Sequence, residues 1–213
     1  MWMGGEVVGY SWHDIRVLHL FIKTEEILNI QPGSFIQLKY KGVIRAYDIV
    51  NYGNTNIIEL FIALKNNGQM SKLLENIKLN DKMEISKPIS SLKINNKKIL
   101  FISGGTGISK FLPIMRAYEN NELDLDEVWL FHSSRKISEF PFLKEILRYN
   151  KVKAVLTFTR EKTNEFLNER ITKHLLEKYL DLNNYDIYIC GPKQFVENIK
   201  NDLKKYRVVS YSW

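Results

Sequence analysis

The chain has 213 residues, of which 45% are hydrophobic and 26% are charged, and its formal net charge is +7. This composition is typical of a globular protein with one large or two small domains. No apolar run approaches the roughly 20 residues that a membrane-spanning helix needs, and no segment resembles a secretion signal. Cys190 is the only cysteine, which excludes an intrachain disulfide and a four-cysteine metal or iron–sulfur site. We therefore expect a cytoplasmic protein without a metal centre or a membrane span.

The positive net charge favours anionic partners such as nucleotides, nucleic acid or an acidic protein. The lysines are scattered along the chain rather than clustered. No recognised nucleic-acid-binding motif and no basic stripe on a single helix accompany them. We therefore expect no nucleic-acid binding. A nucleic-acid-binding protein is the weakest of the alternatives that the charge leaves open.

The first 95 residues show the period-two alternation of β-strands. The alternation is clearest where Ile58, Leu60 and Ile62 share one face and Glu59 and Phe61 share the other. Short strands separated by Gly, Pro and Asn turns predict a small antiparallel β-barrel, interrupted by one short helix over 70–77. The predicted strands are 6–10, 15–23, 35–40, 43–50, 56–64 and 82–86.

The period changes after Lys97, where strand-like and helix-like segments alternate. Such alternation predicts an α/β domain with a parallel sheet and helices on both sides, whose ligands bind outside the carboxyl ends of the strands. We therefore expect two domains, 1–95 and 96–213. The predicted strands are 99–103, 127–132, 152–159 and 186–190, and the predicted helices are 108–120, 138–149, 169–179 and 193–206.

The most informative segment is Gly104-Gly105-Thr106-Gly107, which lies between a predicted strand and a predicted helix. Glycines let backbone N–H groups approach a phosphate, and the positive end of the helix dipole adds attraction. A tight strand-to-helix turn also needs glycine for purely structural reasons, so this motif alone does not decide between the two interpretations.

A second turn, Cys190-Gly191-Pro192, closes the fourth predicted strand of the α/β domain and opens its last helix. Taken alone, Gly191 and Pro192 are ordinary turn residues and Cys190 is an ordinary buried side chain.

Arginines beside hydroxyl groups follow two neighbouring predicted strands. Ser134-Arg135 follows the second strand, Thr159-Arg160 follows the third, and Arg170 comes ten residues later. Guanidinium groups match phosphate oxygens, and hydroxyls supply further hydrogen bonds. Together they favour a phosphate-binding group at this edge of the sheet.

Two segments of the barrel half have the same character. Arg45-Ala46-Tyr47-Asp48 ends one predicted strand, and Gly68-Gln69-Met70-Ser71 opens the short helix. A helix N-terminus attracts anions, and Arg45 offers a countercharge. Alone, each segment is equally compatible with a half-exposed strand and an ordinary helix start.

Together and in this order, the segments resemble the ferredoxin–NADP reductase family, in particular the bacterial ferredoxin/flavodoxin–NADP reductases. The resemblance covers essentially the whole chain. The matching pieces are PGSFIQL, RAYDIVN, NGQMSKLL, LNDKMEIS, GGTGISKFLPIM, LFHSSR, TFTRE, YICGPKQFVENI and SYSW.

The resemblance implies a flavin on the barrel, with FAD favoured over FMN, and NADP(H) on the α/β domain. On the barrel it implies that Arg45 and the turn from Gly68 to Ser71 hold the flavin pyrophosphate and that Tyr47 packs on the isoalloxazine ring. Trp213 is similar to the C-terminal aromatic residue that stacks on the flavin. On the α/β domain, the resemblance assigns the NADP pyrophosphate to the loop from Gly104 to Gly107. It assigns the nicotinamide to the turn at Cys190 and the 2′-phosphate to Arg135, Thr159-Arg160 and Arg170.

One residue departs from the family pattern, in which a serine or threonine follows the tyrosine. Here that position is Asp48. The resemblance places the usual hydroxyl near flavin N5, the atom that accepts hydride, so that a carboxylate there would disfavour an anionic reduced flavin. The departure leaves the flavin potential open.

We therefore expect an oxidoreductase that transfers hydride between NADP(H) and FAD and single electrons to or from an acidic carrier, ferredoxin or flavodoxin. Two alternatives stay open. The chain is a reductase component or subunit of a larger oxygenase or dehydrogenase complex, or it is a redox-inactive regulatory subunit that binds nucleotide.

Overall fold

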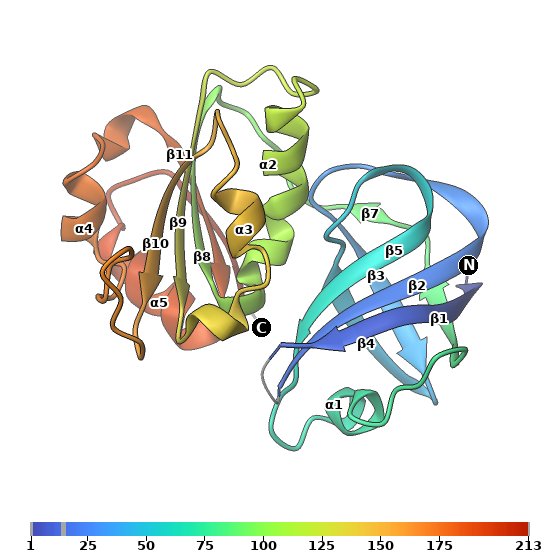
Figure 1. The fold of residues 1–213 in the computed structure, drawn as a ribbon. Helices are drawn as coiled ribbons and strands as arrows, with labels where there is room; N and C mark the ends of the chain where they lie inside the picture. Colours follow the sequence, from blue (N-terminus) through green and yellow to red (C-terminus); the bar gives the residue numbers. More distant parts are fainter. Residues whose placement is uncertain (1, 14–15, 213) are drawn as a thin grey trace. The chain divides into compact units, whose positions relative to one another are not determined.

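The computed structural model describes residues 2–13 and 16–212. The chain forms two compact units (Figure 1). Unit 1 comprises Met1–Leu92 and Ser109–Ile114, and unit 2 comprises Lys93–Ile108 and Met115–Trp213. In the part of the chain that the structure describes, no helix has the length and apolar character needed to span a bilayer.

Unit 1 is an antiparallel barrel, as the sequence predicts. Its strands follow the order β4-β3-β6-β1-β2-β5, with β7 paired to β3. A bridge between Ile49 and Leu60, just beyond β4, joins that end of the sheet to β5. The elements are β1 (Trp2–Trp12), β2 (Val17–Ile30), β3 (Ser34–Tyr40), β4 (Val43–Asp48), β5 (Gly53–Ala63), α1 (Gln69–Leu74), β6 (Lys82–Ser86) and β7 (Ile89–Ser90).

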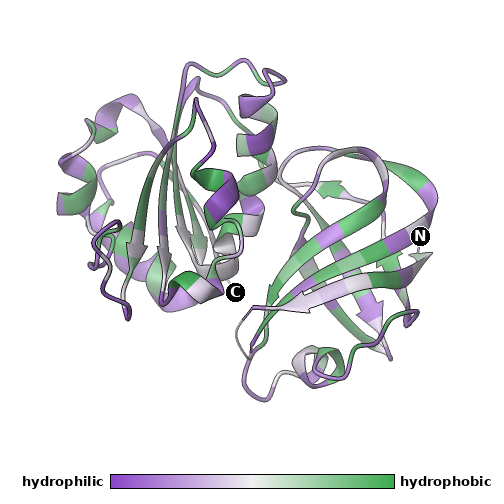
Figure 2. Ribbon diagram, in the orientation of Figure 1, coloured by the Kyte–Doolittle hydropathy of each residue, from purple (hydrophilic) through white to green (hydrophobic). Residues whose placement is uncertain are grey.

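The barrel encloses the apolar residues that the period-two pattern selects. Ile58, Leu60 and Ile62 of β5 are buried against Leu18 and Leu20 of β2. Each fully buried side chain of this kind contributes about 1.5–3 kcal/mol of transfer free energy. Figure 2 shows the resulting alternation of hydrophobic and hydrophilic residues along these strands.

Unit 2 has a parallel sheet of order β10-β9-β8-β11-β12. One face carries α4 and α5, whose residues Leu175 and Val196 share a core with Ile102 and Ile189. Helices α2 and α3 lie on the other face (Figure 1). The strands are β8 (Lys98–Gly104), β9 (Glu127–Ser134), β10 (Lys153–Phe158), β11 (Asp186–Gly191) and β12 (Val208–Ser212). The helices of this half of the chain, in which Ser109–Ile114 belongs to unit 1, are η1 (Gly105–Lys110), α2 (Leu112–Glu119), η2 (Ile137–Glu139), α3 (Leu143–Ile146), α4 (Lys173–Glu177), η3 (Leu182–Asn184) and α5 (Lys193–Asp202).

The predicted helix over 108–120 is wrong at its start. Gly105–Lys110 forms a 3-10 turn, and the α-helix begins only at Leu112. Pro113 accounts for this boundary, because it has no N–H to bond the carbonyl of Ser109 and its ring would clash there. The apolar residues that suggested one helical face, Ile108, Phe111, Leu112 and Met115, are nevertheless all fully buried.

Three further helix predictions in unit 2 are too long, including that over 193–206, where the helix ends at Asp202, and two strands, β7 and β12, are missing from the prediction. In 138–149 only Leu143–Ile146 is α-helical, because Pro141 interrupts the segment, and in 169–179 the helix starts after Thr172, whose hydroxyl caps it. The strand β12 pairs with β11 in a segment that was not predicted as a strand.

Candidate functional site

The glycine loop after β8 lies beside the turn that ends β11. The two strands are parallel neighbours, and Cys190 is opposite Ser103 in the register. A Cβ atom added to Gly107 would lie 2.2 Å from the carbonyl oxygen of Cys190. The two glycine turns of unit 2 are therefore in direct contact at the carboxyl edge of the sheet, where ligands of such sheets bind.

The glycines of this edge serve different purposes. Gly107 and Gly191 are required by packing, since a Cβ on Gly191 would lie 2.7 Å from the ring of Phe195. Gly105 is different, because it has φ +52° and a Cβ there would meet nothing within 4 Å. Gly105 is needed for its backbone conformation, and the space beside it is open. Thr106 is half-buried next to it.

The thiol side of this edge is closed to solvent. Cys190 is 1% exposed, whereas the following Pro192 is exposed and precedes the first residue of α5. The assignment of Cys190 and Gly191-Pro192 to the nicotinamide end of NADP stays a prediction.

A buried histidine that the sequence analysis did not identify lies beneath the same edge. His132 Nδ1 is 2.8 Å from the hydroxyl of Ser103, and His132 Nε2 is 2.8 Å from the hydroxyl of Ser134. The ring also stacks on Phe140 at 4.1 Å. Burial lowers the pKa of His132 to about 3, so the imidazole is neutral at neutral pH and bridges the ends of β8 and β9.

This network limits the availability of the Ser134 hydroxyl for a phosphate. Its side chain is 5% exposed and its hydroxyl is already bonded to His132. The signal in the sequence was the segment His132-Ser133-Ser134, which places the histidine and Ser134 on the same face of a strand.

The structure brings together two of the three predicted arginines. The backbone N–H of Arg160 donates to the carbonyl of Arg135 at 2.9 Å, and that of Thr159 donates to the carbonyl of Ser134 at 3.0 Å. The guanidinium of Arg135 pairs with Glu139 at 3.0 Å. Arg160 is exposed, and within the described ranges its side chain makes no ion pair. Arg170 is exposed as well, but no hydrogen bond or ion pair among the described residues joins it to the other two.

On the barrel, β4 presents the segment from Arg45 to Asp48. The exposed guanidinium of Arg45 donates to the carbonyl of Ile44 and pairs with no carboxylate among the residues described. The adjacent Ala46 is exposed. Tyr47 packs partly against the barrel core, and this burial raises its pKa to about 12, so the phenol keeps its proton.

The helix α1 lies beside β4 and brings the second barrel motif next to the first. Gly68 is its N-cap and provides no side-chain hydrogen bond, so the first N–H groups of the helix are not capped by a side chain. The hydroxyl of Ser71 accepts a bond from the N–H of Lys65 at 2.8 Å, and Met70 is buried in the core, whereas Gln69 is exposed. An exposed arginine on a strand that contacts a helix start without a side-chain cap suits a pyrophosphate.

Asp48 has a partner that the sequence analysis missed. Its carboxylate accepts a hydrogen bond from the ammonium of Lys110 at 2.9 Å, and Lys110 also donates to the hydroxyl of Ser91. Burial raises the pKa of Asp48, and the charge of Lys110 opposes that rise. Lys110 is 62 residues from Asp48 in the sequence, so no local pattern links the two. The one signal in the sequence was that Lys110 lies among apolar residues, where a lysine needs a partner.

Trp213, predicted to stack on the flavin, lies outside the described residues. Within them, β12 ends at Ser212, which is paired with Gly191.

Comparison with known proteins identifies both halves of the chain. Residues 10–94 match the family described as the oxidoreductase FAD-binding domain, and residues 101–201 match the oxidoreductase NAD-binding domain. The predicted binding of FAD and of a nicotinamide dinucleotide is thereby confirmed.

The chain is 30% identical to the flavodoxin/ferredoxin–NADP reductase of Buchnera aphidicola subsp. Baizongia pistaciae, over 80% of this chain and 78% of that protein. Among solved structures, a Neisseria gonorrhoeae ferredoxin NADP+ reductase with bound FAD and NADP has the same fold, with a TM-score of 0.86 and 21% identity over 99% of this chain and 98% of that chain. The ferredoxin reductase in carbazole 1,9a-dioxygenase gives a TM-score of 0.83 and 25% identity over 100% of this chain and 69% of that chain. This chain therefore belongs to the flavodoxin/ferredoxin–NADP reductase family of oxidoreductases.

Proposed function

We propose that this protein transfers reducing equivalents between NADPH and a separate one-electron carrier, ferredoxin or flavodoxin, by way of FAD. The observation that carries the proposal is that each unit presents an anion-binding arrangement of its own. In unit 1, Arg45 lies on the strand beside the uncapped start of α1. In unit 2, the glycine loop lies against the turn at Cys190.

The residues of the barrel bind and orient the flavin. The guanidinium of Arg45 and the first N–H groups of α1 hold the pyrophosphate, while Tyr47 stays protonated and packs on the ring. Bound FAD supplies the ring that exchanges a hydride with the nicotinamide, which is chemistry of the cofactor and not of the side chains.

The residues of unit 2 bind the pyridine nucleotide. Its pyrophosphate approaches the backbone at Gly105, where the space is open. Its 2′-phosphate binds Arg160 first, because Arg135 is already paired with Glu139. This arrangement supports NADPH over NADH, since a guanidinium fork matches phosphate oxygens. Thr159 and Arg170 are further candidates for the same phosphate.

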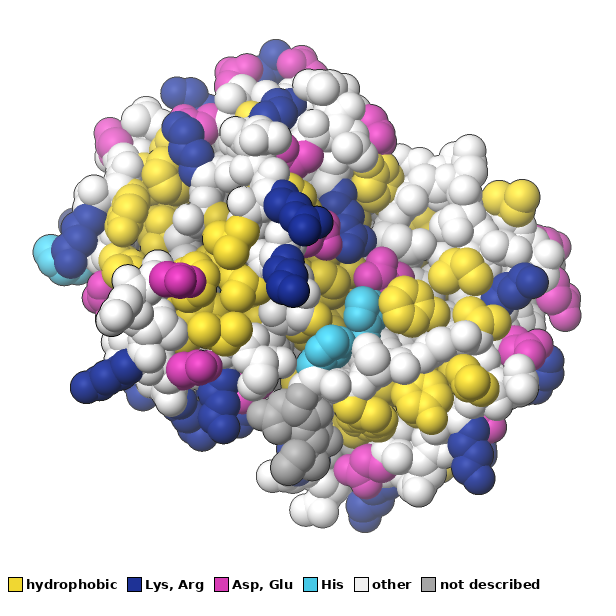
Figure 3. Space-filling model, in the orientation of Figure 1, with side chains coloured by type: hydrophobic (Ala, Val, Ile, Leu, Met, Phe, Trp, Pro, Cys, Tyr) yellow, Lys and Arg dark blue, Asp and Glu magenta, His cyan; other side chains and the backbone are white. Residues whose placement is uncertain are grey.

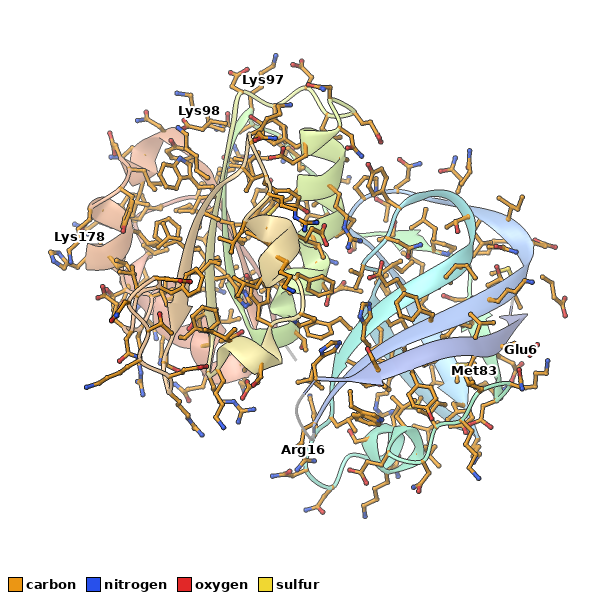
Figure 4. All side chains as sticks on the ribbon, viewed as in Figure 1. Glu6, Arg16, Met83, Lys97, Lys98 and Lys178 are labelled. Carbon is orange, nitrogen blue, oxygen red and sulfur yellow. The ribbon has the colours of Figure 1, made fainter. Side chains whose placement is uncertain are left out.

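The carrier is expected to be acidic. With a net charge of +7, the protein attracts an acidic protein by long-range steering. Lysines such as Lys97, Lys98 and Lys178 lie on the surface of unit 2 (Figure 4). Figure 3 shows basic side chains interspersed with acidic ones rather than gathered in one patch on the face in view.

The decisive test is an anaerobic titration of the FAD-reconstituted protein with NADPH, followed by ferredoxin or flavodoxin. The flavin absorbance should bleach with NADPH and return when the carrier is added. A protein that binds NADPH without bleaching would instead be a regulatory nucleotide-binding subunit.

A second candidate is a reductase component of an oxygenase. The similarity to the ferredoxin reductase in carbazole 1,9a-dioxygenase supports it. Bleaching by NADPH without reoxidation by ferredoxin or flavodoxin, but with reoxidation by an oxygenase component, would favour this candidate.

A further inference from the structure

A lysine is enclosed in the barrel unit. The side chain of Lys110 is 3% exposed, although lysines are almost never fully buried unless they are paired. Its ammonium donates to Asp48 and to Ser91, and it lies 5.8 Å from the centre of the Phe35 ring. Burying an ammonium costs several kcal/mol unless a counter-ion and hydrogen bonds offset the loss of water.

The counter-ion stands at the end of the strand that carries the flavin motif. Asp48 is the last residue of β4, which also bears Arg45 and Tyr47. Its side chain is 24% exposed, and one carboxylate oxygen is paired with Lys110. Lys110 reaches it from the end of the turn that begins in the glycine loop.

We propose that Lys110 is a positioning residue of the flavin site, which fixes Asp48 and cancels its charge, so that the Asp48–Lys110 pair presents no net charge to the flavin. This inference rests on the proposed function, because it requires a flavin to be bound at the end of β4.

The physical basis is the charge of the flavin. The reduced ring carries more negative charge than the oxidised ring, so a lone carboxylate nearby disfavours reduction and a lone ammonium favours it. A close pair of opposite charges largely cancels both effects. The family resemblance implies an uncharged hydroxyl at this position. A lone Asp48 would add a negative charge there, whereas the Asp48–Lys110 pair has no net charge and so resembles the hydroxyl in this respect.

The test compares the two-electron midpoint potential of bound FAD in wild-type protein, D48N and D48N/K110M. D48N removes the carboxylate that pairs with Lys110 and so one negative charge, and we expect the affinity for reduced relative to oxidised FAD to rise at least tenfold, which is about 30 mV for a two-electron couple. The added K110M substitution removes the remaining charge and should return the potential to the wild-type value. K82M, which removes an exposed lysine paired with Glu6, is the matched control and should leave the potential unchanged.

Two results would overturn the inference. One is a D48N potential equal to that of the wild type, and the other is a D48N/K110M potential equal to that of D48N, which is what a purely structural role of Lys110 predicts. If D48N does not fold, D48S and D48S/K110M make the same comparison. Wild-type protein that holds no FAD would contradict the proposed function itself, which is a different outcome from FAD bound with unshifted potentials.

Discussion

The backbone of Gly107 lies so close to Cys190 that a Cβ on the glycine would be 2.2 Å from the carbonyl oxygen and 2.6 Å from the carbonyl carbon. Both contacts are with backbone atoms, which cannot turn away as a flexible side chain would. The loop from Gly104 to Gly107 therefore holds its shape only while position 107 has no side chain.

We expect Gly107→Ala to lower the free energy of unfolding by about 3 kcal/mol, at the upper end of the usual cost of overpacking. The same substitution should weaken NADPH binding, because the loop must shift. Gly105→Ala is the matched control: it meets no atom but has φ +52°, so its cost should be only about 1 kcal/mol. Chemical denaturation of both variants measures the difference, and equal costs would contradict the packing argument.

Arg160→Ala should raise the KM for NADPH by about tenfold to a hundredfold, the loss expected for a charge-assisted hydrogen bond. The KM for NADH should change little, because NADH has no 2′-phosphate. Steady-state kinetics with both nucleotides measure this selectivity. Arg148→Ala, which removes an exposed arginine of unit 2, is the control. Equal effects of Arg160→Ala on both nucleotides would remove the 2′-phosphate assignment.

Arg45→Ala should raise the Kd for FAD at least about tenfold, because the pyrophosphate loses its countercharge. Lys41→Ala, in the turn before β4, changes an exposed lysine and should leave FAD affinity unaltered. Fluorescence titration of the apoprotein with FAD measures both constants. Unchanged flavin affinity in Arg45→Ala would show that the barrel motif is not the pyrophosphate site.

The buried His132 should make the protein sensitive to acid. Its pKa is about 3 in the folded state against 6.5 when it is unperturbed, because burial disfavours the imidazolium. Between these values the unfolded chain binds the additional proton. The contribution of neutral His132 to the free energy of unfolding therefore has its full value above about pH 6.5. It falls by about 1.4 kcal/mol for each pH unit as the pH drops toward 3.

Denaturation curves of wild-type protein and His132→Asn across this pH range measure that contribution. The variant should be less stable at pH 7 but should lose less stability on acidification. His174→Asn, at an exposed histidine of α4, should keep the steep wild-type dependence. Parallel curves for wild type and His132→Asn would contradict a neutral buried imidazole.

Much of the fold follows from periodicity. The alternation at Ile58, Leu60 and Ile62 identified the barrel core, since a residue two positions along a strand returns to the same face. The strands of the parallel sheet were recognisable as apolar runs because both of their faces are covered. The helix starts were harder, since Pro113 and Pro141 override an apolar pattern that extends beyond them.

The motifs at Arg45 and Gly104 were visible in the sequence because each is a continuous segment whose residue types suit an anion. The partners of Asp48 and Ser103 were not visible. Lys110 and His132 reach them only after distant strands have paired, and no local pattern encodes which buried polar groups will meet.

The sequence by itself determined the two kinds of architecture, their order and the segments that suit phosphate, because local periodicity and turn chemistry depend on neighbouring residues. Only the tertiary structure decided that Lys110 pairs with Asp48, that His132 bonds the hydroxyl of Ser103, and that Gly107 is held against Cys190. Those outcomes depend on side chains that strand pairing brings within hydrogen-bonding or van der Waals distance from remote parts of the chain.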